Sequence, residues 1–138
     1  MREARPKGCG SRAKRGIIPT MTRVLVAVDP LLYREVIAHA VRKHRPRVEV
    51  LTAEPDDLDS DETTRVLAPH LVVCNRATGA VREVAHSWVE LEVRPGPVGL
   101  DANIKVDHRP LSRVEQAEID DVLAAVDETQ RMLRRGAH

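Results

Sequence analysis

Three short apolar runs, rich in β-branched residues, constrain the fold of this chain more than any other feature of its sequence. They are RVLVAV at 23–28, VEVLTA at 48–53 and HLVVCN at 70–75. The first and third are the continuous apolar runs expected of strands buried on both faces, as parallel strands between helices are, and the second is also predicted to be a strand. Apolar residues recur at helical spacing over 31–44, and a short helix is expected near 61–68. The pattern predicts an α/β domain with a mainly parallel sheet.

Polar and proline residues mark where the first elements begin and end. Asp29 is predicted to be the N-cap of the first helix, with Pro30 at its first helical position. The acidic stretch 54–62 does not have the residue order of an EF-hand loop, so we expect a solvated connection. Ser60 or Asp61 is the expected cap of the short helix that follows.

After the third run the pattern is less regular, and only a short helix fits before the next strand. SWVELEV at 87–93 alternates like a strand, with either Trp88 facing inward or Val89, Leu91 and Val93 facing inward. The segments 102–106 and 111–115 flank a turn-like DHRP, and they form a β-hairpin or contribute one strand to the sheet. A helical stripe over 119–133 closes the domain.

Charge divides the chain unevenly. The first 20 residues carry six Arg and Lys against the single acid Glu3, a net +5, so the whole-chain charge of +1 leaves residues 21–138 at −4. The composition predicts a disordered basic tail at 1–20 and a single domain at 21–135. Met21, directly before the first strand, is an alternative translation start. A mildly acidic domain argues against nucleic acid as its partner and leaves that role to the tail.

Residues with reactive side chains do not follow the spacing of a known centre. Cys9 and Cys74 form no ligand pair, and the six histidines have no close ligand spacing. A nucleophile elbow and a glycine-rich phosphate loop are both lacking. We therefore predict no catalytic residue, no metal and no cofactor. The sequence has no apolar stretch long enough to cross a membrane and no signal-peptide pattern, which predicts a cytoplasmic protein without membrane contact.

The order of these elements resembles the receiver domain of bacterial response regulators. The likeness is carried by a first strand that ends at Asp29, a helix opened by PLLYRE at 30–35, a third strand that ends at Asn75, and a closing helix. It is clearest over residues 22–75. The resemblance implies a three-layer, flavodoxin-like fold with a mainly parallel five-stranded sheet, truncated here in its second half.

The sequence departs from the receiver family at most of the family's functional positions. Receivers hold Mg²⁺ with an acid pair after the first strand, and here Asp29 stands between Val28 and Pro30. Asn75 occupies the position of the phosphate-accepting Asp, and an amide is a poor nucleophile. The fourth strand offers no hydroxyl, and whether Lys105 replaces the family's lysine depends on the order of the last strands. The resemblance therefore implies a pseudo-receiver that is not phosphorylated on a conventional Asp.

Two functions remain open from the sequence. The first is a non-catalytic receiver-like module of signal transduction that acts through a protein partner or by self-association. The alternative is a small-molecule binding protein or enzyme that uses a cleft at Asp29 and Asn75, because ligands of open α/β sheets bind at the carboxyl ends of the strands. Against that alternative, a helix cap at Asp29 and a turn cap at Asn75 would explain both residues structurally.

Overall fold

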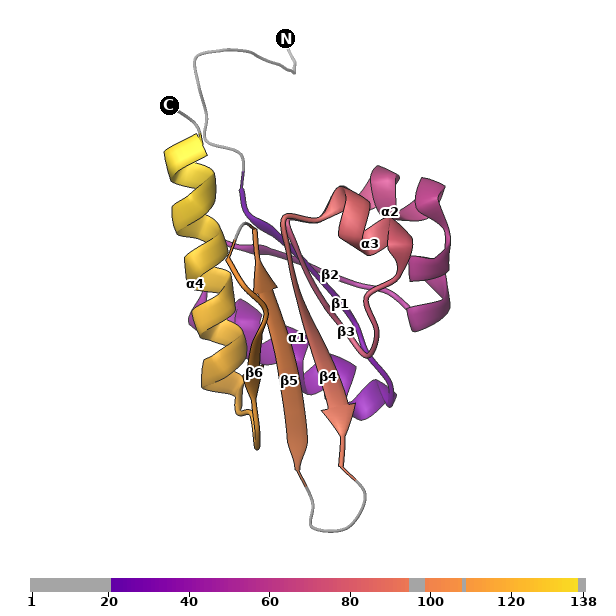
Figure 1. Ribbon diagram of the computed structural model, residues 1–138, viewed down its shortest axis with the longest axis vertical. Coiled ribbons are helices and arrows are strands. Elements are labelled where there is room, and N and C mark those ends of the chain that lie inside the picture. Colours follow the sequence, from indigo (N-terminus) through magenta and orange to yellow (C-terminus); the bar gives the residue numbers. More distant parts are fainter. Residues whose placement is uncertain (1–20, 95–98, 108, 137–138) are drawn as a thin grey trace, which may run out of the picture.

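The sheet of this protein has six strands within the part of the chain that the structure describes. A computed structural model describes residues 21–94, 99–107 and 109–136, so the predicted tail and Cys9 lie outside it. Figure 1 shows the strands, which lie in the order β2-β1-β3-β4-β5-β6. The strands are β1 (Arg23–Ala27), β2 (Glu49–Thr52), β3 (Leu71–Cys74), β4 (Ser87–Val93), β5 (Leu100–Val106) and β6 (Ser112–Val114). The helices are α1 (Leu31–His44), the 3-10 helix η1 (Pro55–Asp59), α2 (Asp61–Leu67), α3 (Gly79–Val84) and α4 (Ile119–Gly136).

The sheet is mixed, which corrects the predicted five-stranded, mainly parallel sheet. Strands β2, β1, β3 and β4 pair in parallel, as the three apolar runs and the short helices between them predicted. Strands β4, β5 and β6 pair in antiparallel fashion. The reason is the short connection after β4, where the Arg94 N–H donates to the Gly99 carbonyl at 3.0 Å. A parallel return would need a crossover of a dozen or more residues. The possible hairpin of the last two segments is present, as β5 and β6.

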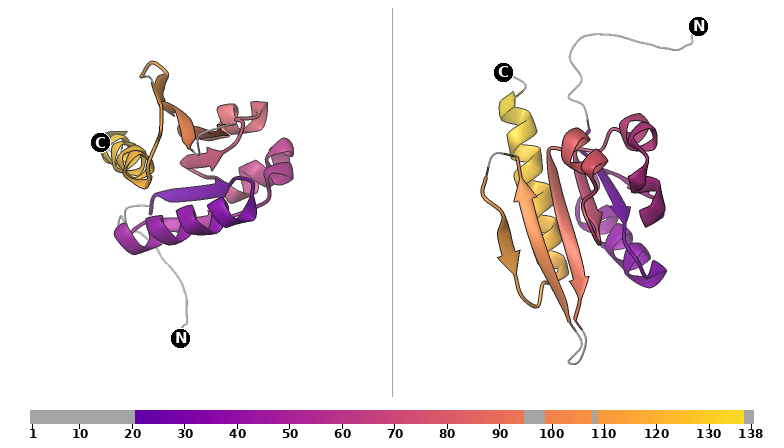
Figure 2. Two further views of the ribbon diagram at one scale, coloured as in Figure 1. Left: turned by 90° about the horizontal axis from the view of Figure 1, so that it is seen from below. Right: turned by 45° about the vertical axis from the view of Figure 1, so that its right-hand side comes forward.

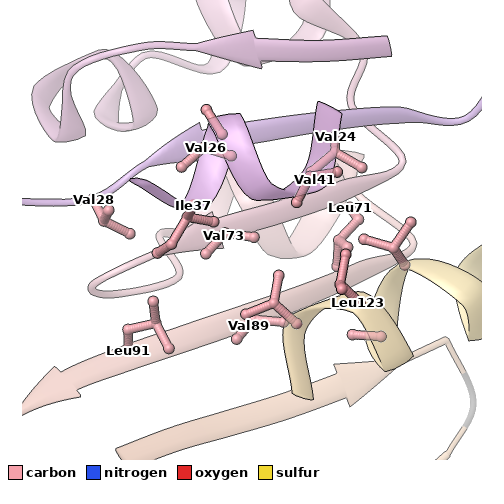
Figure 3. Close-up of a cluster of buried hydrophobic side chains, with 14 of the residues drawn as sticks. Val24, Val26, Val28, Ile37, Val41, Leu71, Val73, Val89, Leu91 and Leu123 are labelled. Atoms are coloured by element: carbon pink, nitrogen blue, oxygen red, sulfur yellow. The ribbon is translucent and has the colours of Figure 1, made fainter. Parts of the chain in front are cut away.

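Helices cover the sheet on both sides and give it three layers (Figure 2). On one face α1 and α4 pack on Val24, Val26, Leu71, Val73 and Val89, which form the larger core seen in Figure 3. On the other face Leu58 of η1 and the helix α3 pack on alternate residues of β1 and β3. Burial on both faces explains why these two strands are continuously apolar.

The strands of the second half have a helix on one face only. In the right-hand view of Figure 2, no helix lies in front of β5 and β6. This face is polar, and its buried Asp101 accepts from the Gln116 N–H at 3.0 Å and from Arg113 at 3.1 Å. Val89 and Leu91 of β4 are buried on the side of α1 and α4, as one prediction had it, but Val93 is 50% exposed. The half-buried Trp88 packs on the opposite side. One solvated face is ordinary for antiparallel strands.

The acidic stretch after β2 is ordered, which corrects the expected loop. It forms η1, which Leu58 anchors in the core, and then α2. Ser60 is the N-cap of α2, as predicted, and its hydroxyl accepts from the Thr63 N–H at 3.1 Å. The Thr78 hydroxyl caps α3 and also donates to the Leu58 carbonyl at 2.7 Å, so η1 and α3 are tied together.

His70 and His86 lie at the end of the sheet where the parallel strands β3 and β4 begin. The His70 ring Nδ1 accepts from the Arg23 N–H at 2.9 Å, and the His70 N–H donates to the Arg23 carbonyl at 2.9 Å. The His86 ring stacks on His70 with a centroid separation of 6.0 Å. Burial, together with the nearby His86 and Arg23 charges, lowers the pKa of His70. The neutral ring is therefore the form that fits this edge, because a protonated Nδ1 cannot accept.

Among the helices of the described residues, none has the length and apolar character needed to span a membrane.

Candidate functional site

The carboxyl ends of β1 and β3 bring the two predicted binding residues together. These strands are parallel neighbours, with Ala27 opposite Cys74, so Asp29 and Asn75 follow at the same edge. The Asp29 N–H donates to Asn75 Oδ1 at 2.7 Å, and Asn75 Nδ2 donates to the Asp29 carbonyl at 3.1 Å. The prediction that both residues end adjacent parallel strands is confirmed. The Asn75 side-chain amide thus pairs with the Asp29 backbone as a peptide group of a neighbouring strand would.

The Asn75 amide also reaches toward a third strand. Its Nδ2 lies 3.5 Å from the Leu91 carbonyl of β4, which is at the limit of a hydrogen bond. One short side chain therefore connects the chain segments that follow β1 and β3, and lies beside β4. Both ends of the amide, acceptor and donor, are engaged by the protein itself.

The Asp29 carboxylate faces a cation from α1. Arg34 donates through Nη2 to Asp29 Oδ1 at 3.2 Å and through Nε to the Val28 carbonyl at 3.1 Å. The Arg34 side chain is 12% exposed, whereas the Asp29 side chain is 67% exposed. The sequence analysis did not identify Arg34 as a site residue. The signal was available, because Arg34 lies in the first turn of the helix that follows Asp29.

Asp29 does not cap α1, which corrects the sequence prediction. The N-cap is Pro30, and α1 begins one residue later than a Pro at the first helical position would require. The Tyr33 N–H donates to the Pro30 carbonyl at 3.0 Å. The amide of Asn75 binds the Asp29 backbone and the guanidinium of Arg34 binds its carboxylate, so the Asp29 carboxylate pairs with a side chain of the first turn and accepts no backbone N–H of α1.

The charges at this edge do not resemble a divalent-cation centre. The carboxylate of Asp29 is compensated by the adjacent guanidinium of Arg34. Hard cations such as Mg²⁺ prefer several oxygen ligands with net negative charge. No group of three or more His, Cys, Asp or Glu able to hold a metal occurs within residues 21–94, 99–107 and 109–136.

Glu90 is a second residue that sequence reasoning missed. It lies opposite Cys74 in the β3–β4 register, and its carboxylate accepts from the Ala77 N–H at 2.7 Å. It therefore fixes the turn that follows Asn75. Burial, with the Glu90 charge, raises the pKa of the Cys74 thiol to about 12, so the predicted burial of Cys74 is confirmed and its thiolate is disfavoured. An acid at an alternating position of a strand was the available signal.

Lys105 does not reach this edge of the sheet. Because β5 runs antiparallel, Lys105 is opposite Trp88, near the start of β4, while Leu100 and Asp101 are opposite the end of β4. Its ammonium group donates to the Arg109 carbonyl. Lys105 therefore does not stand where a receiver keeps its lysine after the fifth strand.

Comparisons with known proteins give two remote likenesses. Neither the protein-family models nor the curated proteins match this sequence. Among solved structures, methionyl-tRNA formyltransferase from Clostridium thermocellum is similar with a TM-score of 0.43 and 10% identity over 82% of this chain, which spans 61% of that chain. Protein VC0702 from Vibrio cholerae is similar with a TM-score of 0.34 and 19% identity, over 78% of each chain. Likenesses this remote do not indicate a shared function.

Proposed function

We propose that this protein is a non-catalytic, receiver-like module that acts through contacts with protein partners. One observation carries the proposal. At the end of β3, where a receiver keeps its phosphate-accepting carboxylate, the Asn75 amide is bonded in both directions to the Asp29 backbone. A side chain used in this way holds two strands together and offers neither charge nor a free oxygen to a ligand.

Phosphoryl transfer to this edge would need an ionised oxygen as nucleophile and a cation to neutralise the phosphate. The amide supplies no ionised oxygen. The Asp29 carboxylate, which follows β1, already accepts from Arg34. The scaffold keeps the neighbouring strand ends of a receiver-like site while its polar groups bond to one another. We place this module in the cytoplasm, as the sequence predicts, with a second protein or a second copy as its partner.

A phosphodonor assay tests the proposal directly. The purified chain is incubated with Mg²⁺ and a small acyl-phosphate donor, and its intact mass is followed beside a receiver domain that accepts phosphate from the same donor. We expect the control to gain about 80 Da, one phosphoryl group, while the mass of this chain stays unchanged. An 80 Da adduct that maps to Asp29 or Asn75 would overturn the proposal.

The alternative of a small-molecule site has its own readout. A specific ligand at about 100 times its dissociation constant would stabilise the fold by about 2.7 kcal/mol, which a thermal-shift screen of nucleotides, sugars and organic acids detects. We expect no shift that depends on Asp29. A stabilising compound whose effect disappears in Asp29→Ala, a change at an exposed side chain, would favour the alternative.

A further inference from the structure

The exposed side of α1 carries apolar side chains near its start, with the exposed acid Glu35 beside them, and basic side chains near its end. Leu32, Val36, His39 and Lys43 recur at helical spacing and share one side of the helix. Leu32 is 67% exposed and Val36 is 48% exposed, two of the more exposed large apolar side chains among the described residues. Arg42 flanks Lys43 and is also exposed. We call this stripe, with Arg42, the α1 surface.

The opposite side of the sheet carries a surface of the reverse order. In η1 and α2, the exposed acids Asp56, Asp59 and Glu62 precede Val66, which is 76% exposed. Glu62 and Val66 are one turn apart on α2 and share its outer side. Within the described residues, the carboxylates of these three acids make no hydrogen bond or ion pair. We call these four residues the α2 surface.

The two surfaces match in both charge and polarity. If α2 of one molecule lies antiparallel to α1 of another, Val66 meets the apolar start of the α1 surface and the acids meet its basic end. Along a helix, the seven residues from Val36 to Lys43 span about 10 Å. The four residues from Val66 back to Glu62 span about 6 Å, and Asp59 extends the acidic part beyond Glu62. In this antiparallel arrangement the amide end of α2 lies near the carbonyl end of α1, so the two helix dipoles point in opposite directions.

We propose that the α1 surface binds the α2 surface of a second copy of this chain. Charge complementarity favours a second copy, because both halves of the contact are present on one sequence. The contact also gives Leu32, Val36 and Val66 apolar partners. The two surfaces belong to helices on opposite faces of the sheet, so the contact must form between molecules. The inference rests on the proposed function, since it names the partner of that protein-interacting module.

Complementary charge reversal tests the contact. The first variant carries Arg42→Glu and Lys43→Glu, and the second carries Asp59→Lys and Glu62→Lys, all at exposed positions. Self-association of the full chain is measured by analytical ultracentrifugation over a concentration series, and circular dichroism verifies the fold of each variant. We expect the native chain to associate, and each variant to associate about tenfold or more weakly, because each meets like charge in its own copies.

An equimolar mixture of the two variants separates a lost contact from a damaged fold. The mixture restores opposite charges between unlike molecules, so we expect its association to return toward that of the native chain. The matched control for the first variant carries Arg134→Glu and Arg135→Glu. It changes the net charge by the same amount, on exposed residues of α4, and should leave association unchanged.

A native chain that stays monomeric up to about 1 mM overturns the inference. The inference also fails if neither variant weakens association, or if the α4 control weakens it equally. A mixture of two folded variants that does not associate would overturn it as well. None of these results bears on phosphate acceptance. The proposed function is therefore judged separately by the phosphodonor assay.

Discussion

The Asn75 amide should contribute measurably to stability, and Asn75→Ala is the change that shows it. The substitution removes both hydrogen bonds to the Asp29 backbone, at 2.7 and 3.1 Å. Each bond contributes about 1 kcal/mol net, and the weak approach to Leu91 is neglected, so we expect a loss of about 2 kcal/mol. Asn75→Asp keeps an acceptor for the Asp29 N–H but places an anionic oxygen against the Asp29 carbonyl, for a loss of about 1 to 2 kcal/mol.

Urea unfolding followed by circular dichroism measures this loss. With a slope of about 2 kcal/mol per molar urea, the midpoint of Asn75→Ala should fall by about 1 M with its slope unchanged. Asn103→Ala is the matched control. Among the described residues the Asn103 side chain accepts a hydrogen bond only from Arg113, and it lies on the face of β5 that no helix covers. We expect that control to lose less than about 0.5 kcal/mol.

A loss in Asn75→Ala no larger than in Asn103→Ala would refute the reasoning. It would mean that the contacts of the amide are replaced by water at little cost. Asn75 would then be free for another role at the strand ends, and the ligand-binding alternative would become the better explanation of the site.

Three further predictions follow from burial and pKa. Because folding lowers the pKa of His70, the unfolded chain binds the proton more readily, so the melting temperature should fall as the pH drops below about 6.5. His70→Asn retains a hydrogen-bond acceptor and should weaken this pH dependence. In a Cys9→Ser background, Cys74, with its pKa raised to about 12, should resist iodoacetamide at pH 8 until urea unfolds the chain, and fast labelling of the native protein would contradict its burial. Leu58→Ala should cost about 2 to 4 kcal/mol in urea unfolding, because this fully buried side chain anchors η1, and a cost below about 1 kcal/mol would show that η1 is not part of the core.

The sequence predicted the parallel half of the fold well, because that half depends on local patterns. Burial on both faces makes β1 and β3 continuously apolar, and the helical pattern over 31–44 located α1, although the structure starts the helix one residue after the predicted Pro30. The hairpin of β5 and β6 remained open because Asn103, Lys105 and Arg113 face solvent and interrupt the apolar pattern. Pairing between such strands depends on tertiary contacts that a pattern does not record.

The candidate site was located but not understood from the sequence. Strand ends placed Asp29 and Asn75 together, since parallel neighbours share one edge. What the sequence could not reveal was the direction of each side chain. The hydrogen bonds of Asn75 join residues 46 apart in the chain, and Glu90 of β4 binds Ala77 in the turn after the neighbouring β3. Helix-capping rules consider only close neighbours in the chain, so they assigned Asp29 the wrong partner.

The consecutive arrangement of β4, β5, β6 and α4 bears on the order in which the chain folds. Strands β4, β5 and β6 each pair with the one before, and α4 packs on β4 and β5, so this part can assemble by closing short loops. By contrast, Arg23 and His70 must close a segment of 47 residues before β1 meets β3. We expect residues 87–136 to gain protection from hydrogen exchange first during refolding, with β1 inserted late between β2 and β3. Truncation within α4 would then remove part of the nucleus, and would slow folding more than truncation of equal length before β1.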